Sequence, residues 1–237
     1  MRKSVAAVIA ASTALVGCGD HGGGGTVARN YQVGNFQQIE VAGPYEVDVR
    51  TGSGPTVSAS GPEKLLGSTV VAVQGDKLVI HPENNHGFHF GWGIHGNARF
   101  TITVPQLTGA TIAGSGGIHV DRVQGQSFEG EVAGSGGLEV ASMNVQQLKV
   151  SVGGSGSVKA GSGKVQAAEY EIGGSGDVDA ANVQAQQAKI SIAGSGGVRA
   201  NATGTADVNV MGSGDVTVSG GAKCTVSKAG SGSVRCS

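Results

Sequence analysis

The sequence predicts an all-β fold: a parallel, single-stranded β-helix (β-solenoid) with coils of about 20 residues, preceded by an all-β N-terminal layer. Two observations support this prediction. The tripeptide Gly-Ser-Gly recurs at nearly fixed spacing, and apolar residues alternate with polar residues on both sides of each copy. The tripeptide begins at Gly114, Gly134, Gly154, Gly174, Gly194, Gly212 and Gly230, so the spacing is constant over the first five copies and slightly shorter over the last two.

Residues 1–17 have the features of a secretory signal peptide. Met1-Arg2-Lys3 is basic, and an apolar, alanine-rich stretch follows it. The stretch is shorter than the roughly 20 residues that a membrane-spanning helix needs, although a frayed terminus or a short membrane helix is the alternative. Leu15-Val16-Gly17-Cys18 resembles the bacterial lipobox, Leu-x-Gly/Ala-Cys. This resemblance implies a lipoprotein that is cleaved before Cys18 and acylated on that residue.

Residues 18–30 form a glycine-rich tether in this interpretation, because Gly22–Gly25 have no side chains to pack. Gly19 follows the cysteine in place of the aspartate that is associated with retention in the inner membrane. In a two-membrane bacterium the lipoprotein resemblance therefore implies an outer-membrane anchor, on either the periplasmic or the outer face.

Residues 31–106 are predicted to form the N-terminal all-β part. Short runs with period-2 alternation indicate strands, Gly75-Asp76 indicates a tight turn, and Pro62–Leu66 indicates one helical turn. The candidate strands are Gln37–Val41, Tyr45–Arg50, Thr56–Ser60, Val70–Gln74, Lys77–His81 and Ala98–Val104. We expect this part to pack as the opening layer of the solenoid.

Residues 107–237 are predicted to form the Gly-Ser-Gly repeat solenoid. Each coil consists of a strand, the Gly-Ser-Gly turn, a second strand and a second corner, with the serines in a ladder along one edge. One coil buries too few apolar side chains to offset its ordering entropy, so the coils must stack. The general preference for right-handed parallel crossovers favours a right-handed coil. Four positions after the start of each tripeptide stand Ile118, Leu138, Val158, Val178, Val198, Val216 and Val234, all expected to point inward.

Cys224 and Cys236 both fall at inward offsets, at equal distances before and after Gly230 in the sequence. The corresponding facing pairs narrow to alanines in the preceding coils, which brings the two sulfurs within reach of each other. An exported protein folds in an oxidising compartment, so we predict a disulfide, with two buried free thiols as the alternative.

The segment Asn84–Gly96 is the most distinctive part of the chain chemically, and three interpretations remain open. A decorated hairpin loop that covers one end of the core is the favoured one. A contact loop would use Phe88, Phe90 and Trp92 to touch a partner or a membrane. A site for zinc, copper or nickel would use His86, His89 and His95, which follow His81 in the sequence.

The order of several motifs resembles that of a known family. "FQQIEVAGPYEVDV", "KLVIH" and "FTITVPQLTGATIAGSGGIHV" are followed by repeated "GSGDV"-like coils. Together they resemble the head GIN domain family of putative auto-transporter adhesins, from about Phe36 to the C-terminus. The resemblance implies an all-β, solenoid-like fold on exported bacterial proteins and supplies no catalytic residues.

The expected function is that of a non-enzymatic, lipid-anchored cell-envelope protein: an adhesin, a scaffold or a surface-interaction module. Its partners are the membrane, through the anchor, and an unidentified protein or polysaccharide, with self-association at the open C-terminal end. A net charge of −1 indicates no nucleic-acid partner, and no catalytic motif or cofactor site is recognised. The alternatives are a metal-binding accessory protein using residues 81–95 and a carbohydrate-active β-helix enzyme. The enzyme would use Glu139, Asp179 and Asp215, for which we expect no basic partners.

Overall fold

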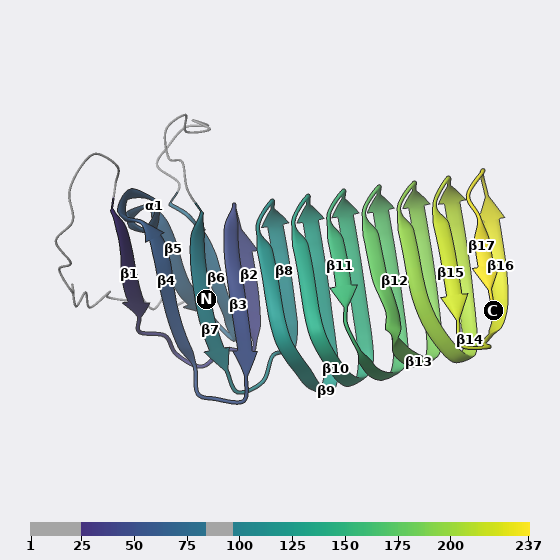
Figure 1. Cartoon of the computed structure of the whole chain (residues 1–237), viewed down its shortest axis with the longest axis horizontal. Coiled ribbons are helices and arrows are strands. Elements are labelled where there is room, and N and C mark those ends of the chain that lie inside the picture. Colours follow the sequence, from purple (N-terminus) through teal and green to yellow (C-terminus); the bar gives the residue numbers. More distant parts are fainter. Residues whose placement is uncertain (1–24, 84–96) are drawn as a thin grey trace, which may run out of the picture.

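The computed structural model describes residues 25–83 and 97–237, which form one elongated β-solenoid (Figure 1). Its strands stack along the long axis in two faces. Face A contains the strand segments that follow the Gly-Ser-Gly corners, and face B contains the segments that precede them. All corners lie along one edge of the solenoid, at the top of Figure 1, and the chain bends from face A to face B along the opposite edge. The predicted fold class is confirmed, and the hand of the coil stays a prediction.

The repeat region consists of long strands that continue around the bend from one face to the other. Neighbouring coils pair in parallel with a shift of one repeat, so that Leu138 pairs with both Ile118 and Val158. The shift becomes shorter within β14, where the register changes at the bend. These strands are β9 (Gly117–Gly134), β10 (Gly137–Gly154), β11 (Ser157–Ala160), β12 (Gly163–Gly174), β13 (Asp177–Gly194), β14 (Gly197–Gly212), β15 (Asp215–Ser219), β16 (Lys223–Ala229) and β17 (Val234–Cys236).

The N-terminal part contains the six predicted strands and the predicted helical turn, preceded by one further strand. Its elements are β1 (Thr26–Tyr31), β2 (Gln38–Ala42), β3 (Tyr45–Thr51), β4 (Thr56–Pro62), α1 (Glu63–Gly67), β5 (Thr69–Gln74), β6 (Lys77–Pro82) and β7 (Ala98–Val104). The first strand of the repeat region, β8 (Gly109–Gly114), follows them. These elements belong to the same sheet system as the repeats, because β3 and β8 both pair with β9.

The stacking order of the N-terminal part differs from its order in the sequence. On face A the order is β1, β4, β7, β3 and β9, and on face B it is β5, β6, β2, β8 and β9. The pair β2–β3 forms a coil of its own, with a corner at Gly43 that makes backbone hydrogen bonds with Ala113 and Gly116 (3.0 and 3.1 Å). The pair β6–β7 forms the coil beyond it, and antiparallel strands complete that end.

The core consists of the inward columns that the repeat predicts. Ile118, Leu138, Val158, Val178, Val198 and Val216 are each at most 4% exposed. Lys228 interrupts an apolar column of face B in the last coil, and there its side chain is exposed and its Nζ donates a hydrogen bond to the Gly232 carbonyl (2.7 Å). β16 and β17 are stacked on one side only, so their inward residues are less covered, as Val226 shows at 47% exposed.

The Gly-Ser-Gly corners require glycine at both outer positions. Gly154 has a φ of +118°, and a Cβ added there would lie 2.5 Å from the Gly134 carbonyl oxygen of the preceding coil. A Cβ on Gly156 would lie 2.5 Å from a methyl group of the buried Val132. The serine between them is exposed in all seven corners, and the Ser155 amide donates to the Gly134 carbonyl (2.9 Å). The corners therefore stack by backbone contact and leave a ladder of hydroxyl groups outside.

Tyr170 carries a buried hydroxyl whose hydrogen-bonding capacity is unused within the described part of the chain. The residue is 1% exposed and lies in an inward column of face B between Val150 and Ile190. Burial raises the pKa of this phenol far above its ordinary value of 10.0. An unsatisfied buried hydroxyl costs about 1–3 kcal/mol.

We therefore expect Tyr170→Phe to raise the free energy of unfolding by about 1 kcal/mol. Above pH 10 the unfolded chain loses the phenol proton while the folded chain keeps it, so the stability of the native protein falls as pH rises, and the gain from the variant grows. Urea denaturation at neutral and alkaline pH measures both effects. Tyr45→Phe is the control, because the Tyr45 hydroxyl bonds to Thr69 Oγ1 at 3.0 Å and its removal should destabilise. Equal losses in the two variants would contradict the assignment.

Candidate functional site

Several predicted functional residues lie outside the described residues. They are Cys18, His86, His89, His95, Phe88, Phe90 and Trp92, so the lipid anchor, the metal site and the contact loop stay predictions. The structure does place the two ends of the histidine-containing segment. β6 ends at Pro82 and β7 begins at Ala98, at the same edge as the corner around Gly43. His81 Nδ1 lies 2.7 Å from the Pro82 carbonyl oxygen.

Residues 25–83 and 97–237 contain neither a membrane-spanning helix nor a metal-binding cluster. No helix in these ranges is long and apolar enough to cross a bilayer. No three His, Cys, Asp or Glu side chains in this part of the chain are grouped so that they could hold a metal ion.

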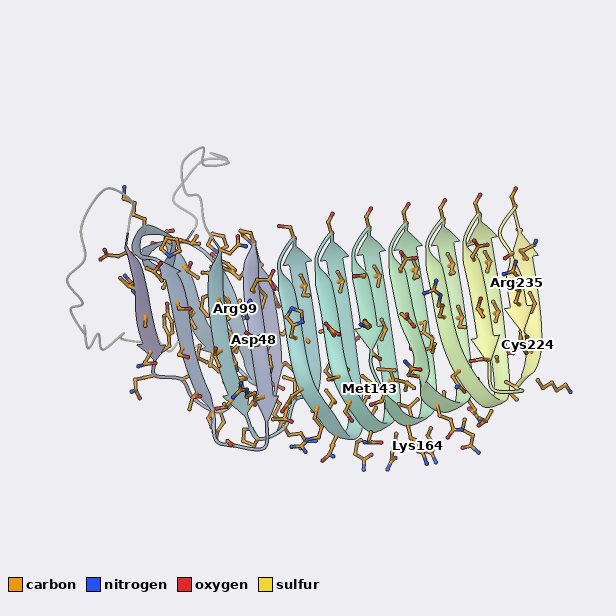
Figure 2. All side chains as sticks on the ribbon, in the orientation of Figure 1. Asp48, Arg99, Met143, Lys164, Cys224 and Arg235 are labelled. Atoms are coloured by element: carbon orange, nitrogen blue, oxygen red, sulfur yellow. A yellow bond between two sulfur atoms is a disulfide. The ribbon has the colours of Figure 1, made fainter. Side chains whose placement is uncertain are left out.

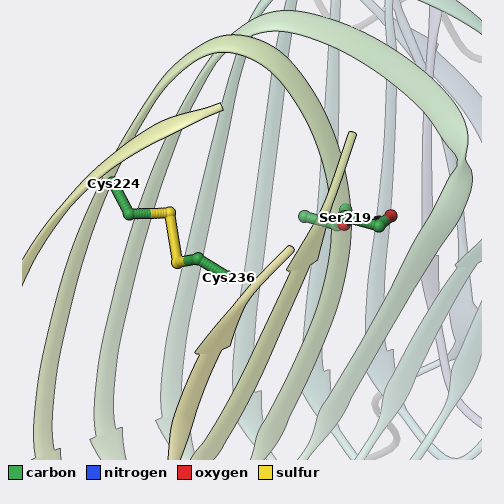
Figure 3. Close-up of a disulfide and its surroundings, with 4 residues drawn as sticks. Ser219, Cys224 and Cys236 are labelled. Carbon is green, nitrogen blue, oxygen red and sulfur yellow. Dashed lines mark hydrogen bonds between the residues drawn. A yellow bond between two sulfur atoms is a disulfide. The ribbon is translucent and has the colours of Figure 1, made fainter. Parts of the chain in front are cut away.

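The predicted disulfide between Cys224 and Cys236 is present (Figure 3). Cys224 of β16 continues the column of Ala206 on face B, and Cys236 of β17 continues the column of Val218 on face A. Their Cα atoms are 6.6 Å apart, so the bond crosses the interior of the last coil. In the chain-entropy account, a disulfide that closes a loop this short stabilises the folded state by about 3 kcal/mol. It stabilises the last coil, which stacks against another coil on one side only.

Face A carries an outward column of mostly charged side chains, one from each successive coil. Figure 2 shows Asp48 and Arg99 close together at one end of the solenoid, where their side chains form an ion pair of 3.0 Å, and Arg235 at the other end. The outward column consists of Asp48, His119, Glu139, Lys159, Asp179, Arg199, Thr217 and Arg235. We call this column the face A ladder.

The carboxylates of the face A ladder have basic partners, contrary to the expectation from the sequence. Glu139 lies 3.3 Å from His119 Nδ1 and 3.5 Å from Lys159 Nζ, and Asp179 lies 3.6 Å from Arg199. The expectation was wrong for Glu139 and Asp179, because their partners stand a whole coil apart in the sequence and become neighbours only when the coils stack. For Asp215 no ion pair is found among the described residues. The charged groups are largely exposed, so each pair contributes at most about 1 kcal/mol.

A hollow of about 480 Å³ lies over Gly197 on face A, between Asp177 and Asp215. Asp177 Oδ1 accepts a hydrogen bond from the Gly197 amide (3.0 Å), and Asp215 Oδ1 accepts one from the Ser233 amide (2.9 Å). The Ser233 hydrogen bonds lower the pKa of Asp215, so this carboxylate stays ionised. A general acid for glycoside cleavage needs a raised pKa instead, so Asp215 does not fit that role.

A furrow of about 660 Å³ runs along face B, beside the bend. Its first row of side chains is Ser127, Gln147, Ala167, Gln187 and Thr205. Its second row is Glu129, Lys149, Glu169, Lys189 and Asp207. The buried residues Phe128, Leu148, Ala168 and Ala188 contribute to the floor between the rows, and Gln38 and Thr108 extend one end. We call this depression the furrow.

The furrow was not predicted from the sequence, although the repeat contains part of its signal. Beside the furrow, the bend carries exposed glutamines at the same position of four successive coils: Gln126, Gln146, Gln166 and Gln186. Apolar columns in the repeat identify the core directly. Polar columns indicate a binding surface only when the structure shows which of them border a depression.

Comparisons with known proteins agree with this architecture. The family model described as "Putative auto-transporter adhesin, head GIN domain" matches residues 35–222. A search of curated proteins finds no match.

Several solved structures have the same fold. A putative adhesin from Bacteroides fragilis is 25% identical with a TM-score of 0.82, and the match covers 90% of this chain and 97% of that chain. A putative lipid binding protein from Parabacteroides distasonis is 23% identical with a TM-score of 0.69, at coverages of 90% and 97%. A putative adhesin from the same species is 19% identical with a TM-score of 0.71, at coverages of 90% and 98%. Because the family model spans most of its length, the chain belongs to the head GIN domain family of putative auto-transporter adhesins.

Proposed function

We propose that this protein is a non-enzymatic adhesin of the bacterial cell envelope, tethered by an acylated Cys18 and making contact through the long faces of its solenoid. The observation that carries the proposal is the repetition of exposed polar side chains along both faces, at the spacing of the coils. Such a surface offers many equivalent contacts to an extended partner. Membership of a family named for adhesins supports the same role.

The electrostatics of the solenoid also support adhesion. Catalytic sites gather a few titratable groups with perturbed pKa values in one cleft. Here the charges are spread over successive coils and are paired with their neighbours, as Lys189 and Glu169 are at 2.7 Å. This pairing lowers the pKa of Glu169 and raises that of Lys189, so both side chains stay charged at neutral pH.

The proposal is tested by attachment of whole cells. A two-membrane bacterium that produces the full chain is compared with the same strain without it and with a strain that produces Cys18→Ala. We expect palmitate labelling and membrane fractionation of the native chain, cleavage of the folded part by protease added to intact cells, and increased attachment to surfaces coated with envelope polysaccharide or protein. Cys18→Ala should lose the label and the attachment.

Two results would overturn the proposal. If the native chain takes up no palmitate label, acylation of Cys18 is excluded. If the native chain is present on the cell surface but attachment is unchanged on every coating, the adhesin function is excluded.

A further inference from the structure

We propose that the furrow on face B binds a linear, uncharged polysaccharide that lies along the long axis of the solenoid, with one sugar unit for each coil. This inference rests on the proposed adhesin function and names the class of ligand for it. Four properties of the furrow lead to it: its length, its polar groups, its floor and its period.

The furrow is long and open, which requires an extended ligand. Its lining residues come from seven consecutive levels of face B: β2, the residue before β8, and then β9, β10, β12, β13 and β14. Six spacings between adjacent strands, at about 4.8 Å each, give a length of about 29 Å. A small metabolite would occupy one coil and leave the others unused, whereas a polymer could contact all of them.

The polar groups of the furrow both donate and accept hydrogen bonds. Gln147 and Gln187 each offer an amide with both capacities, in the row beside the bend. The second row alternates carboxylates with ammonium groups, and its Lys189–Glu169 pair is 2.7 Å long. Lys149 lies 3.7 Å from Glu171, a carboxylate of the adjacent outward column.

This alternation selects against a charged polymer of either sign. An anionic polymer would pass the carboxylates of Glu129, Glu169 and Asp207, and a cationic polymer would pass Lys149 and Lys189. Hydroxyl groups, by contrast, accept from the ammonium and amide groups and donate to the carboxylates. A neutral, hydroxyl-rich chain is therefore the ligand that can satisfy both kinds of group at once.

The floor of the furrow offers little side-chain surface to a sugar ring. Ala167 is small and leaves room in the row beside the bend, whereas the side chains of Phe128, Leu148, Ala168 and Ala188 are buried and point into the core. The Phe128 ring is 2% exposed and offers no face for stacking. Each sugar thus gains little alone, and useful affinity requires several coils to act together.

The period of the furrow favours a polysaccharide over an extended peptide. A pyranose ring with its glycosidic bond is close in length to the coil spacing, so successive sugars can lie over successive coils. An extended peptide repeats its side-chain direction every two residues, or about 6.7 Å, and falls out of step with coils spaced about 4.8 Å apart. The furrow also lies on the face of a sheet, where no free strand edge is available for strand addition.

Calorimetry with defined oligosaccharides tests the inference. The protein is titrated with β-1,4-, β-1,3- and α-1,6-linked glucan oligomers of two, four, six and eight sugars, with polygalacturonate as an anionic comparison and a glutamine- and serine-rich peptide as the peptide comparison. We expect at least one neutral glucan to bind, with an affinity that rises from two to six sugars and then levels off, and we expect neither comparison to bind.

Paired variants locate the binding site. The double variant Gln187→Ala with Lys189→Ala removes one side chain from each row of the furrow and should weaken binding of the hexasaccharide about tenfold or more. The control is Ser175→Ala with Ser195→Ala, two exposed corner serines on the edge of the solenoid, which should leave affinity unchanged. Equal melting temperatures would show that both proteins are folded.

The outcomes separate this inference from the proposed function. Affinity that is already maximal for the disaccharide, equal loss in both double variants, binding of the peptide alone, or no binding of any neutral glucan at millimolar concentration would each overturn the furrow assignment. If cells with the furrow variant still attach as native cells do, the adhesin function stands and the furrow is not its site. If native cells gain no attachment, the proposed function fails whatever the calorimetry shows.

Discussion

A Val178→Asp variant is expected to yield almost no folded protein. Val178 is 2% exposed and lies in the inward column of face A, between Val158 of the preceding coil and Val198 of the following one. An aspartate at this position would bury a charge with no partner, and a buried, unpaired charge costs several kcal/mol or more. Whole domains are stable by only about 5–15 kcal/mol, so a penalty of this size removes much of the total.

The damage should extend beyond one coil, because each coil is stabilised by its neighbours and not by a separate core of its own. The measurements are the yield of soluble protein and the melting temperature by far-ultraviolet circular dichroism. Ser175→Ala in the exposed corner of the same coil is the control and should change stability by no more than about 0.5 kcal/mol. Equal yield and melting for the two variants would show that the inward and outward assignments are wrong.

A Gly154→Ala variant should destabilise the protein by about 3 kcal/mol or more. The φ of Gly154 is +118°, a conformation that residues with a Cβ adopt only at a cost. The added carbon would also lie 2.5 Å from the Gly134 carbonyl oxygen, which accepts the hydrogen bonds of Ser155 and Gly156. Relieving the overlap would separate two stacked corners and lengthen these bonds. Chemical denaturation of the purified variant measures the loss.

Gly153→Ala is the matched control, because it makes the same chemical change at the preceding position. A Cβ at Gly153 meets no atom within 4 Å, and other coils carry alanine at this position, namely Ala113, Ala133, Ala193 and Ala229. We expect this variant to be neutral or to gain about 0.4–1 kcal/mol, because alanine restricts the unfolded chain. A destabilisation of Gly154→Ala no larger than that of Gly153→Ala would show that the corners are not in close backbone contact.

Much of the repeat region follows from one-dimensional information. Alternation with period two assigns each residue to the inside or the outside of a strand, and the interval between successive Gly-Ser-Gly copies states which residues stack. The same two periods place Cys224 and Cys236 opposite each other, and the disulfide is found there. A residue's neighbours in the adjacent coils lie a nearly fixed number of positions away in the sequence, so the contacts between coils can be predicted from this spacing.

The N-terminal part shows where this kind of reasoning stops. Alternation identifies its strands individually, but β6 and β7 lie beyond β2 and β3 in the stack although they come later in the sequence. No repeat connects these segments, and the choice of pairing depends on which arrangement buries Tyr45, Phe100 and their neighbours together. The rings of Tyr45 and Phe100 are 5.6 Å apart, in an edge-to-face contact between strands that are far apart in the sequence.

Periodicity in the chain therefore accounts for the coil, its core, its glycine corners and its cysteine pair, because each of these depends on spacing. The ion pairs of the face A ladder and the furrow of face B depend in addition on the three-dimensional surface. Glu139 finds His119 and Lys159 only once the coils are stacked in register. The furrow lies between two outward rows that line up only when the coils stack, and the small side chain of Ala167 leaves space in the row beside the bend. The depth of such a furrow depends on how neighbouring side chains pack in three dimensions, and the order of residue types along the chain does not specify that packing.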